Sequence, residues 1–591
     1  MMTSRIREFF RSASARGCKR GRAGKLIAWK ICAVFLLCAG TAIAAPAQTY
    51  TILALSAPPD NFGQGNLVQG TDGNFYVVGS FDAVLKVTRA GALTTLASFP
   101  QGSSANSLLL GTDGNFYGTT MYGGAYGYGT IFKITPAGAL TTLYSFCAQS
   151  GCTDGSGPSG LFEGTDGNFY GTAASGGVYN VLCNGGTCGT LFRLTPGGAF
   201  TTMYALCSLP NCTDGATPSG LIQAADGNFY GSTTGGGLNT GPGCNTWEWS
   251  LTHCGTIFRI TPSGTLTTLY NFCSQANCAD GIQPSGLVEA ADGNFYGVTA
   301  AWLIPDGIGL YGTVFKIAPS SALTTLNDGV APSLNGTLIQ ATDHNFYSTM
   351  PRGGYSIGYG TILQITPTGS LIDLIDLGSG LGEFPYDRLL QSTDGNIYGT
   401  TWDGAGYSQR RCRPFPAASC GVFFRLSVGL ASFVSFIRNS GAVGATAQIL
   451  GQGFTGTSSV SFDGIPASFT IESDTYLTAT VPAGATTAPV IVTTPSGTLK
   501  SNQLFRVTPQ IFSFSPENGP VGTSVVITGE SFTGANDVLI GCDSNQTPMS
   551  FTVDSDTQIT AIVPAGAVSG KIGVKTRGGT VSSATGFGIT N

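Results

Sequence analysis

Charged side chains are scarce in this chain. Asp, Glu, Lys and Arg make up 10% of its 591 residues, which include only two histidines and six methionines. The repeat units described below contain no apolar pattern of helical period, which excludes helical bundles and helical solenoids. Little charge and 87 glycines favour short strands joined by tight turns. We therefore expect an all-β protein, and its length predicts several domains.

Catalytic motifs are lacking as well. His253 lies in a loop, and His344 replaces the Gly of a repeated turn. The sequence shows no Ser-His-acid order, no paired-carboxylate motif and no phosphate-binding loop. We predict a protein that is not an enzyme and holds no cofactor and no metal. Glycosidases need only two acids, so a polysaccharide lyase or glycoside hydrolase is the alternative, and the first acids to test are Glu248, Asp306 and Asp403.

The first 47 residues are predicted to be a signal peptide. Basic residues precede a short apolar run at 31–44, and small residues suited to cleavage follow it. The run is short for a membrane span, and Leu37 before Cys38 argues against a lipoprotein anchor. This segment carries nine of the 27 basic residues and one of the 32 acidic ones, so the remainder has a formal charge near −13. We expect a secreted, periplasmic or cell-surface protein that binds no nucleic acid.

One turn motif recurs seven times. It reads DGNFY in five copies, DHNFY in the sixth and DGNIY in the seventh. Spacings of 41 to 66 residues between copies are typical of propellers and solenoids. The copies begin at Asp72, Asp113, Asp166, Asp226, Asp292, Asp343 and Asp394.

The shortest full unit predicts four strands, at 107–110, 115–120, 129–136 and 140–146. β-Branched and aromatic residues fill these strands, and Asp-Gly or Pro-x-Gly stands in the turns. Seven such units predict a seven-bladed β-propeller over residues 48–428. The last unit lacks its fourth strand, and residues 49–56 match it. We predict that the two ends complete one blade together, which removes a free sheet edge.

These units resemble the GloVer tandem repeat of secreted bacterial proteins. The resemblance lies in GTDGNFYG, GT[IL]F[KR][IL]TP and LTTLYSF, and it covers roughly residues 50 to 428. It implies an exported β-rich repeat protein without assigned catalytic residues.

A second, longer unit occurs twice after residue 428. Residues 431–464 align with 509–541, and residues 473–485 align with 555–567. Alternating strands with Gly and Pro turns predict two β-sandwiches, at 429–507 and 508–591. Both are similar to IPT/TIG immunoglobulin-like domains, a resemblance that implies spacer or interaction modules.

Twelve cysteines of the repeat region form local pairs. Two neighbouring pairs, such as Cys147/Cys152 and Cys183/Cys188, would supply the four ligands of a zinc site. The pairs do not occur together in every unit, however, and export favours disulfides. Cys542 is left over and is predicted to be a buried free thiol. The predicted disulfides are Cys147–Cys152, Cys183–Cys188, Cys207–Cys212, Cys244–Cys254, Cys273–Cys278 and Cys412–Cys420.

The predicted binding surface is the face with long connections. In a four-stranded blade the strand 1–2 and 3–4 turns share one face, while the 2–3 and 4–1 connections share the other. The first set is uniformly short, and the second is long, variable and rich in aromatic residues, which suit sugar rings or peptides. The partner would be an extracellular polysaccharide or a surface protein. Alternatively, these aromatics only pack loops onto the ring of a structural envelope protein. The candidate residues are Trp247, Trp249, Trp302, Trp402, Tyr126, Tyr355 and Tyr407.

Two other recurring positions are interpreted as structural. The Asp of each DGN turn lacks the neighbouring carboxylates that calcium prefers, so a turn-forming role is expected. A basic residue recurs in the third strand and is expected to make structural pairs. The Asp of the CTDG or CADG motif is expected to form a turn. The basic positions are Lys86, Lys133, Arg193, Arg259, Lys316 and Arg425, and the turn acids are Asp154, Asp214 and Asp280.

Overall fold

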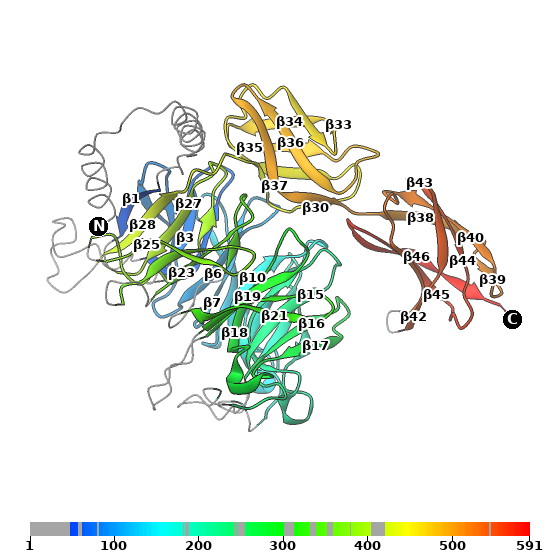
Figure 1. Ribbon diagram of the computed structural model, residues 1–591, viewed down its shortest axis with the longest axis horizontal. Helices are drawn as coiled ribbons and strands as arrows, with labels where there is room; N and C mark the ends of the chain where they lie inside the picture. Colours follow the sequence, from blue (N-terminus) through cyan, green and yellow to red (C-terminus); the bar gives the residue numbers. More distant parts are fainter. Residues whose placement is uncertain are drawn as a thin grey trace, which may run out of the picture. The chain divides into compact units, whose positions relative to one another are not determined.

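The structure is a computed structural model. It describes residues 48–590 except 57–61, 80–81, 181–182, 184–187, 242–243, 245–253, 301–311, 331–337, 352–357, 379, 404–419 and 543–544. The predicted signal peptide lies outside the described residues. Figure 1 shows that the described residues form an all-β structure, in agreement with the sequence. Between the described strands lie three short 3-10 turns: η1 (Ser150–Cys152), η3 (Pro210–Cys212) and η4 (Ala276–Cys278). No helix in the described part is long and apolar enough to span a membrane.

The described residues between 49 and 427 form seven four-stranded antiparallel sheets. Six sheets consist of four consecutive strands, and a DGN-type turn joins the first and second strand of each sheet. The first three sheets contain β2 (Phe62–Gln69), β3 (Phe75–Gly79), β4 (Ala83–Val87), β5 (Leu93–Ser98); β6 (Ala105–Leu110), β7 (Phe116–Thr120), β8 (Thr130–Ile134), β9 (Leu140–Ser145); and β10 (Ser156–Glu163), β11 (Phe169–Ser175), β12 (Thr190–Leu194), β13 (Phe200–Ala205).

The remaining four sheets follow the same plan. They contain β14 (Ala216–Gln223), β15 (Phe229–Gly235), β16 (Thr256–Ile260), β17 (Leu266–Asn271); β18 (Ile282–Glu289), β19 (Phe295–Ala300), β20 (Gly312–Ile317), β21 (Leu323–Val330); β22 (Ile339–Gln340), β23 (Phe346–Met350), β24 (Thr361–Ile365), β25 (Leu371–Asp376); and β26 (Leu390–Gln391), β27 (Ile397–Thr401), β28 (Gly421–Ser427) with β1 (Thr49–Ser56).

The seventh sheet is completed from both ends of the repeat region. Strand β1 pairs antiparallel with β28, from Thr49 opposite Ser427 to Ser56 opposite Gly421. The pairing predicted from the sequence is therefore confirmed. It gives the last sheet its fourth strand and covers an edge of β28 that would otherwise present unpaired backbone groups.

A repeated hydrogen bond joins neighbouring sheets. The last residue of the first strand is Gln or Glu in six sheets. An oxygen of its side chain accepts a hydrogen bond from a backbone N–H of the preceding sheet, that of the residue directly before the turn Asp. The second sheet has Leu110 there and lacks this bond. The bond between Gln69 and Thr393 links the first sheet to the seventh. The six pairs are Glu163–Thr112 (2.8 Å), Gln223–Thr165 (2.8 Å), Glu289–Ala225 (3.2 Å), Gln340–Ala291 (2.9 Å), Gln391–Thr342 (3.0 Å) and Gln69–Thr393 (3.1 Å).

The Phe and Tyr of the NFY motif also connect the sheets. The Tyr of one copy packs against the Phe of the next copy, with ring centroids 4.2–4.4 Å apart at six junctions. The closing pair is Tyr398 with Phe75, at 4.3 Å. The junction without a ring pair follows Tyr347, because the seventh copy has Ile397 where the others have Phe. These buried pairs explain why the motif repeats.

The Asp of each turn fixes the turn to the strand that follows it, through the Asn and Tyr of the same motif. In the second copy, Asp113 accepts hydrogen bonds from the Asn115 N–H at 3.0 Å and the Tyr117 hydroxyl at 2.7 Å. Lys133 forms an ion pair with the same carboxylate at 2.8 Å. Lys86 and Lys316 pair likewise with Asp72 and Asp292. The turn role expected for the Asp and the structural pairing expected for these three lysines are both confirmed.

Two pairs of sheets after residue 428 enclose separate apolar cores. The first sandwich packs β29 (Ser435–Phe436), β31 (Thr446–Leu450), β35 (Tyr476–Thr480) and β34 (Phe469–Ser473) on β30 (Ser440–Gly441), β37 (Gly497–Val507), β36 (Ala488–Thr494), β32 (Ser459–Phe462) and β33 (Ile465–Pro466). The second packs β38 (Gln510–Ser515), β40 (Ser524–Glu530), β44 (Gln558–Ile562) and β43 (Ser550–Ser555) on β39 (Asn518–Gly519), β46 (Gly579–Ile589), β45 (Gly570–Thr576), β41 (Asp537–Cys542) and β42 (Asn545–Pro548).

The prediction of a buried thiol at Cys542 is wrong. Cys542 is free, as predicted, but it is exposed. It is the last residue of β41, and its Sγ lies 3.7 Å from the Ser569 carbonyl oxygen. Strand alternation puts Cys542 on the same side of β41 as Val538 and Ile540, which are buried in the core. Cys542 is exposed because it lies at the end of the strand, beyond that core.

Candidate functional site

The long connections of neighbouring sheets bond to one another. In each sheet the strand 2–3 and 4–1 connections lie at the end opposite the short turns, because consecutive strands are antiparallel. The N–H of Gly157 donates to the Tyr128 carbonyl oxygen of the preceding sheet at 2.9 Å, and Phe384 N–H donates to the Tyr359 oxygen at 2.9 Å. We call the described parts of these connections, such as 121–129 and 146–155, the long-connection rim.

The opposite ends of the sheets carry the DGN turns and the strand 3–4 turns, which we call the short-turn rim. The first sandwich hydrogen-bonds to this rim at three sheets. Among the described residues, neither sandwich hydrogen-bonds to a long connection. The first sandwich therefore contacts part of the short-turn rim. One bond from each of these sheets is Thr475 Oγ1 to Thr71 O (2.7 Å), Gln448 Nε2 to Thr112 O (2.7 Å) and Thr393 Oγ1 to Gly451 O (3.3 Å).

Exposed aromatic residues gather on the long-connection rim. Two predicted site residues are described there and both are exposed, Tyr126 at 53% and Trp402 at 39%. The other five, Trp247, Trp249, Trp302, Tyr355 and Tyr407, lie outside the described residues. Further exposed tyrosines of these connections are Tyr122, Tyr128, Tyr179 and Tyr359. Large exposed rings on connections braced by a rigid scaffold are typical of binding surfaces.

The seventh sheet brings two of its connections together at this rim. The backbones of Glu383 and Asp403 exchange two hydrogen bonds, of 2.6 and 3.1 Å, so the segment before β26 lies beside the end of β27. Tyr386 packs edge-on against Trp402 with centroids 6.0 Å apart, and Phe384 stacks on Tyr386 at 6.3 Å. We call these five residues the seventh-sheet cluster. It combines three aromatic rings with two carboxyl groups.

Backbone and electrostatic features set this cluster apart. Phe384 has a φ of 56°, a left-handed conformation that an aromatic residue rarely adopts and that tends to occur at functional sites. Burial raises the pKa of the Glu383 carboxyl, and the negative charge of Asp403 raises it further. Glu383 therefore holds a proton more readily than an ordinary Glu. A carboxyl group beside aromatic rings is suited to hydrogen-bonding sugar hydroxyls while the rings cover apolar sugar faces.

Sequence reasoning selected Trp402 and Asp403 but missed Glu383, Phe384 and Tyr386. The signal was present: the connection before β26 reads GEFPYD, whereas the corresponding connections of the third to fifth sheets carry CTDG or CADG. The other acids proposed as catalytic, Glu248 and Asp306, lie outside the described residues, as does His253. His344 takes a φ of 65° within its turn, in place of the usual Gly.

Five predicted disulfides are present in the structure, and all lie on the long-connection rim. Cys420 is disulfide-bonded as well, and its predicted partner Cys412 lies outside the described residues. In the third and fourth sheets, two disulfides come together, and each group of four sulfurs lies within 4.8 Å. These groups differ from the combination considered in the sequence analysis. The cysteine pair in the strand 2–3 connection lies beside the pair that follows strand 4 of the same sheet. The Cys147–Cys152 bridge has no second cysteine pair in its sheet.

The acids that follow three of these bridges are structural. Asp154 is completely buried and accepts hydrogen bonds from the Tyr144 hydroxyl at 2.7 Å and from the N–H groups of Ala148 and Gln149. Asp214 and Asp280 make the equivalent bonds. Each acid therefore fixes the small loop that its disulfide closes, as expected from the sequence.

Comparison with known proteins gives distant structural likenesses. The chain is similar to a streptogramin B lyase structure (16% identity, TM-score 0.43, covering 65% of this chain and 99% of that one). It is also similar to virginiamycin B lyase from Staphylococcus aureus (15%, TM-score 0.37, 64% and 98%) and to the WD40 β-propeller domain of Doa1 (12%, TM-score 0.40, 64% and 97%). No curated protein matches the chain.

Family models match both parts of the chain. An IPT/TIG domain model matches residues 509–589, the second sandwich. A model described as the Gloeobacter/Verrucomicrobia repeat matches residues 42–243, 179–412 and 243–457, which together span more than two thirds of the sequence. This agrees with the resemblance read from the GTDGNFYG and LTTLYSF motifs, and the chain belongs to the Gloeobacter/Verrucomicrobia repeat family.

Proposed function

We propose that this chain is an exported, non-enzymatic binding protein that recognises carbohydrate or protein at the cell surface through the long-connection rim. In this proposal the seven sheets are the blades of one closed propeller spanning residues 48–428. Residues 429–507 and 508–591 are two immunoglobulin-like modules of the IPT/TIG type, and residues 1–47 are the signal peptide. Family membership, the disulfides and the IPT/TIG match support an extracellular interaction protein.

The seventh-sheet cluster is the observation that carries the proposal. It presents Trp402 to solvent beside two carboxyl groups on the rim that neither sandwich bonds to among the described residues. Aromatic anchors contribute much of the free energy of recognition, because they bury a large area with few rotatable bonds. Disulfides fix the neighbouring loops, which lowers the entropy lost when a partner binds.

A second candidate function is a carbohydrate-active enzyme at the same cluster. The neighbouring acids Glu383 and Asp403 favour it, because glycosidases use two carboxyl groups, and burial and the charge of Asp403 raise the pKa of Glu383. Binding and catalysis differ in the fate of the ligand, so one experiment separates them.

The test uses the secreted full chain on an array of polysaccharides and glycoproteins, followed by analysis of the products. Saturable binding of an intact ligand supports the proposal, and released oligosaccharide supports the enzyme. Binding to nothing on the array, together with assembly into the envelope, would favour a structural role. N-terminal sequencing of the same secreted material tests the signal peptide, with a new terminus expected near residue 48.

A further inference from the structure

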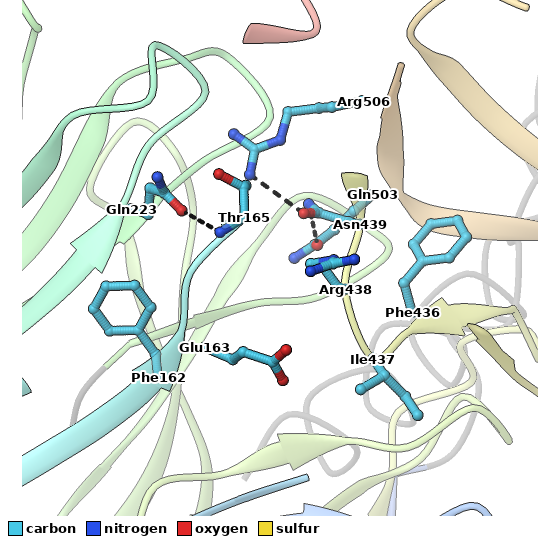
Figure 2. Close-up of a pocket in the computed structure, with 10 residues that line it drawn as sticks. All are labelled: Phe162, Glu163, Thr165, Gln223, Phe436, Ile437, Arg438, Asn439, Gln503 and Arg506. Atoms are coloured by element: carbon cyan, nitrogen blue, oxygen red, sulfur yellow. Dashed lines mark hydrogen bonds between the residues drawn. The ribbon is translucent and has the colours of Figure 1, made fainter. Parts of the chain in front are cut away.

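A cavity of about 160 Å³ lies between the short-turn rim and the first sandwich (Figure 2). One water needs roughly 10–15 Å³ by such a measure, so the cavity has room for a small solute. The rim contributes Phe162, Glu163, Thr165 and Gln223, and the sandwich contributes Phe436, Ile437, Arg438, Asn439, Gln503 and Arg506.

The polar groups on the rim side of this cavity are already engaged. The two Glu163 carboxylate oxygens accept the Thr112 hydroxyl at 2.5 Å and its N–H at 2.8 Å. The side-chain oxygen of Gln223 accepts the Thr165 N–H, and its amide nitrogen donates to the Gly227 carbonyl oxygen. These bonds hold neighbouring sheets together, so the rim side forms a fixed wall.

The sandwich side carries two arginines with unused donors. Arg506 donates from one terminal nitrogen to Asn439 Oδ1 at 3.3 Å, and its buried Nε has no hydrogen-bond partner in the structure. Among the described residues, Arg438 donates no hydrogen bond, and the ion pairs are three Lys–Asp pairs that include neither arginine. In Figure 2 the guanidinium groups of both arginines point toward the space between the rim and the sandwich.

An unpaired buried guanidinium N–H group costs free energy, which a bound acceptor would recover. Burial lowers the pKa of Arg506, and the charges of Glu289 and Asp226 oppose this effect. Arginine nevertheless keeps its charge at neutral pH. Its planar fork matches the two oxygens of a carboxylate, sulfate or phosphate, and the Asn439 and Gln503 side chains offer further amide groups.

We propose that this cavity binds a small oxyanion, a carboxylate or sulfate group, held by Arg438 and Arg506. The oxyanion bridges the first sandwich to the ring of sheets and strengthens that contact. The group is carried either by a free ion or by an acidic sugar, since both present the same oxygens. This site lies on the rim opposite the seventh-sheet cluster and does not depend on the proposed function.

The test is calorimetric titration of the purified full chain with sulfate, acetate and a glucuronic acid disaccharide at constant ionic strength. We expect saturable binding of at least one oxyanion and a rise in melting temperature with its concentration. If sulfate or acetate binds and the disaccharide does not, the natural ligand is a free ion. If the disaccharide binds more tightly than either ion, the natural ligand is an acidic sugar. Both results support an oxyanion site, and no saturable binding by any of the three overturns it.

Substitutions of the two arginines test whether the ion binds in this cavity. Arg438→Gln and Arg506→Gln should each weaken binding at least tenfold, while Arg438→Lys, which keeps the charge and loses the fork, should weaken it less. The matched control is Arg577→Gln, because Arg577 lines a different cavity between the two sandwiches. Equal weakening in Arg577→Gln would show general charge attraction and sink the proposal. If Arg506→Gln fails to fold, Arg438→Gln alone keeps the test valid.

Discussion

The two rims of the sheets use different means to hold their turns. On the short-turn rim, Asp carboxylates bind Tyr hydroxyls and lysines, and the first sandwich bonds to the turns. On the long-connection rim, disulfides and fully buried acids fix loops that leave aromatic rings in solvent. On the short-turn rim the polar groups are engaged in bonds that stabilise the fold. On the long-connection rim some side chains remain available to a partner. Substitutions on the two rims should therefore affect different properties.

The largest effect is expected for stability at the ring closure. Tyr398→Ala removes a buried ring that packs on Phe75 and a hydroxyl that donates to Asp394 at 2.7 Å. The expected loss is roughly 3–5 kcal/mol in the free energy of unfolding. Tyr347→Ala is the control, since Tyr347 makes the same bond to its Asp343 but packs on no ring among the described residues.

Urea denaturation of the two variants measures this difference. The control should lose less, by about 0.5–1.5 kcal/mol, which is the range for an aromatic pair beyond its buried area. Equal losses would mean that the closing ring pair adds nothing to the seventh sheet.

The long-connection rim should show the reverse pattern at Trp402. Trp402→Ala should weaken binding of whatever ligand the array identifies by about 30-fold, or about 2 kcal/mol, and leave the unfolding midpoint unchanged. The reason is that Trp402 is exposed and its ring packs edge-on against Tyr386. Phe512→Ala is the control, because Phe512 is 60% exposed on the second sandwich. An unfolding shift without a binding change would make Trp402 a packing residue.

The disulfides should stabilise by a smaller amount and locally. Replacing Cys147 and Cys152 together by Ala opens a loop of about six residues and should cost about 2 kcal/mol, as the chain-entropy treatment gives for a loop of that length. The buried Asp154 should retain part of the loop structure. Limited proteolysis followed by mass spectrometry should show new cleavage at 147–155. Cleavage at the DGN turns instead would contradict a local role.

The smallest effects concern the dependence of stability on pH. Raising the pH should increase the contribution of an acid on the short-turn rim and decrease that of an acid on the long-connection rim. Burial alone would raise the pKa of Asp113, but hydrogen bonds from Lys133, Tyr117 and Asn115 outweigh it and lower the pKa from 3.8 to about 2. Its contribution to stability is therefore present above pH 4 and lost as the pH falls from 4 to 2. Asp113→Asn should destabilise the chain at pH 7 and have little effect near pH 2.

Glu383 should behave the other way, because burial and then Asp403 raise its pKa above 4.5. Its contribution is present below pH 4.5 and lost as the pH rises through the folded-state pKa. Glu383→Gln should therefore have little effect on the unfolding midpoint at pH 4 and raise it at pH 7. Unfolding midpoints in urea at pH 2.5, 4 and 7 test both variants. The same pH dependence for Asp113→Asn and Glu383→Gln would contradict the predicted electrostatic difference between the rims.

The amino-acid sequence determined the local parts of this protein. Period, turn residues and alternating strands are short-range patterns, so the strands, their order and the five described disulfides followed from it. The pairing of β1 with β28 joins distant segments, and it followed from the count of strands, because the last repeat lacks one and residues 49–56 match it. Each of those cysteine pairs is five or ten residues apart, a separation that a single loop closes.

Tertiary structure alone decided which residues meet across the sheets. Nothing local places Glu383 beside Asp403, two cysteine pairs within 4.8 Å, or Arg438 over the turn of the third sheet. The exposure of Cys542 was also decided by its place at the end of β41, beyond the core of the second sandwich. These contacts join segments tens to hundreds of residues apart. Their geometry depends on how whole sheets pack, which a residue pattern of short range does not encode.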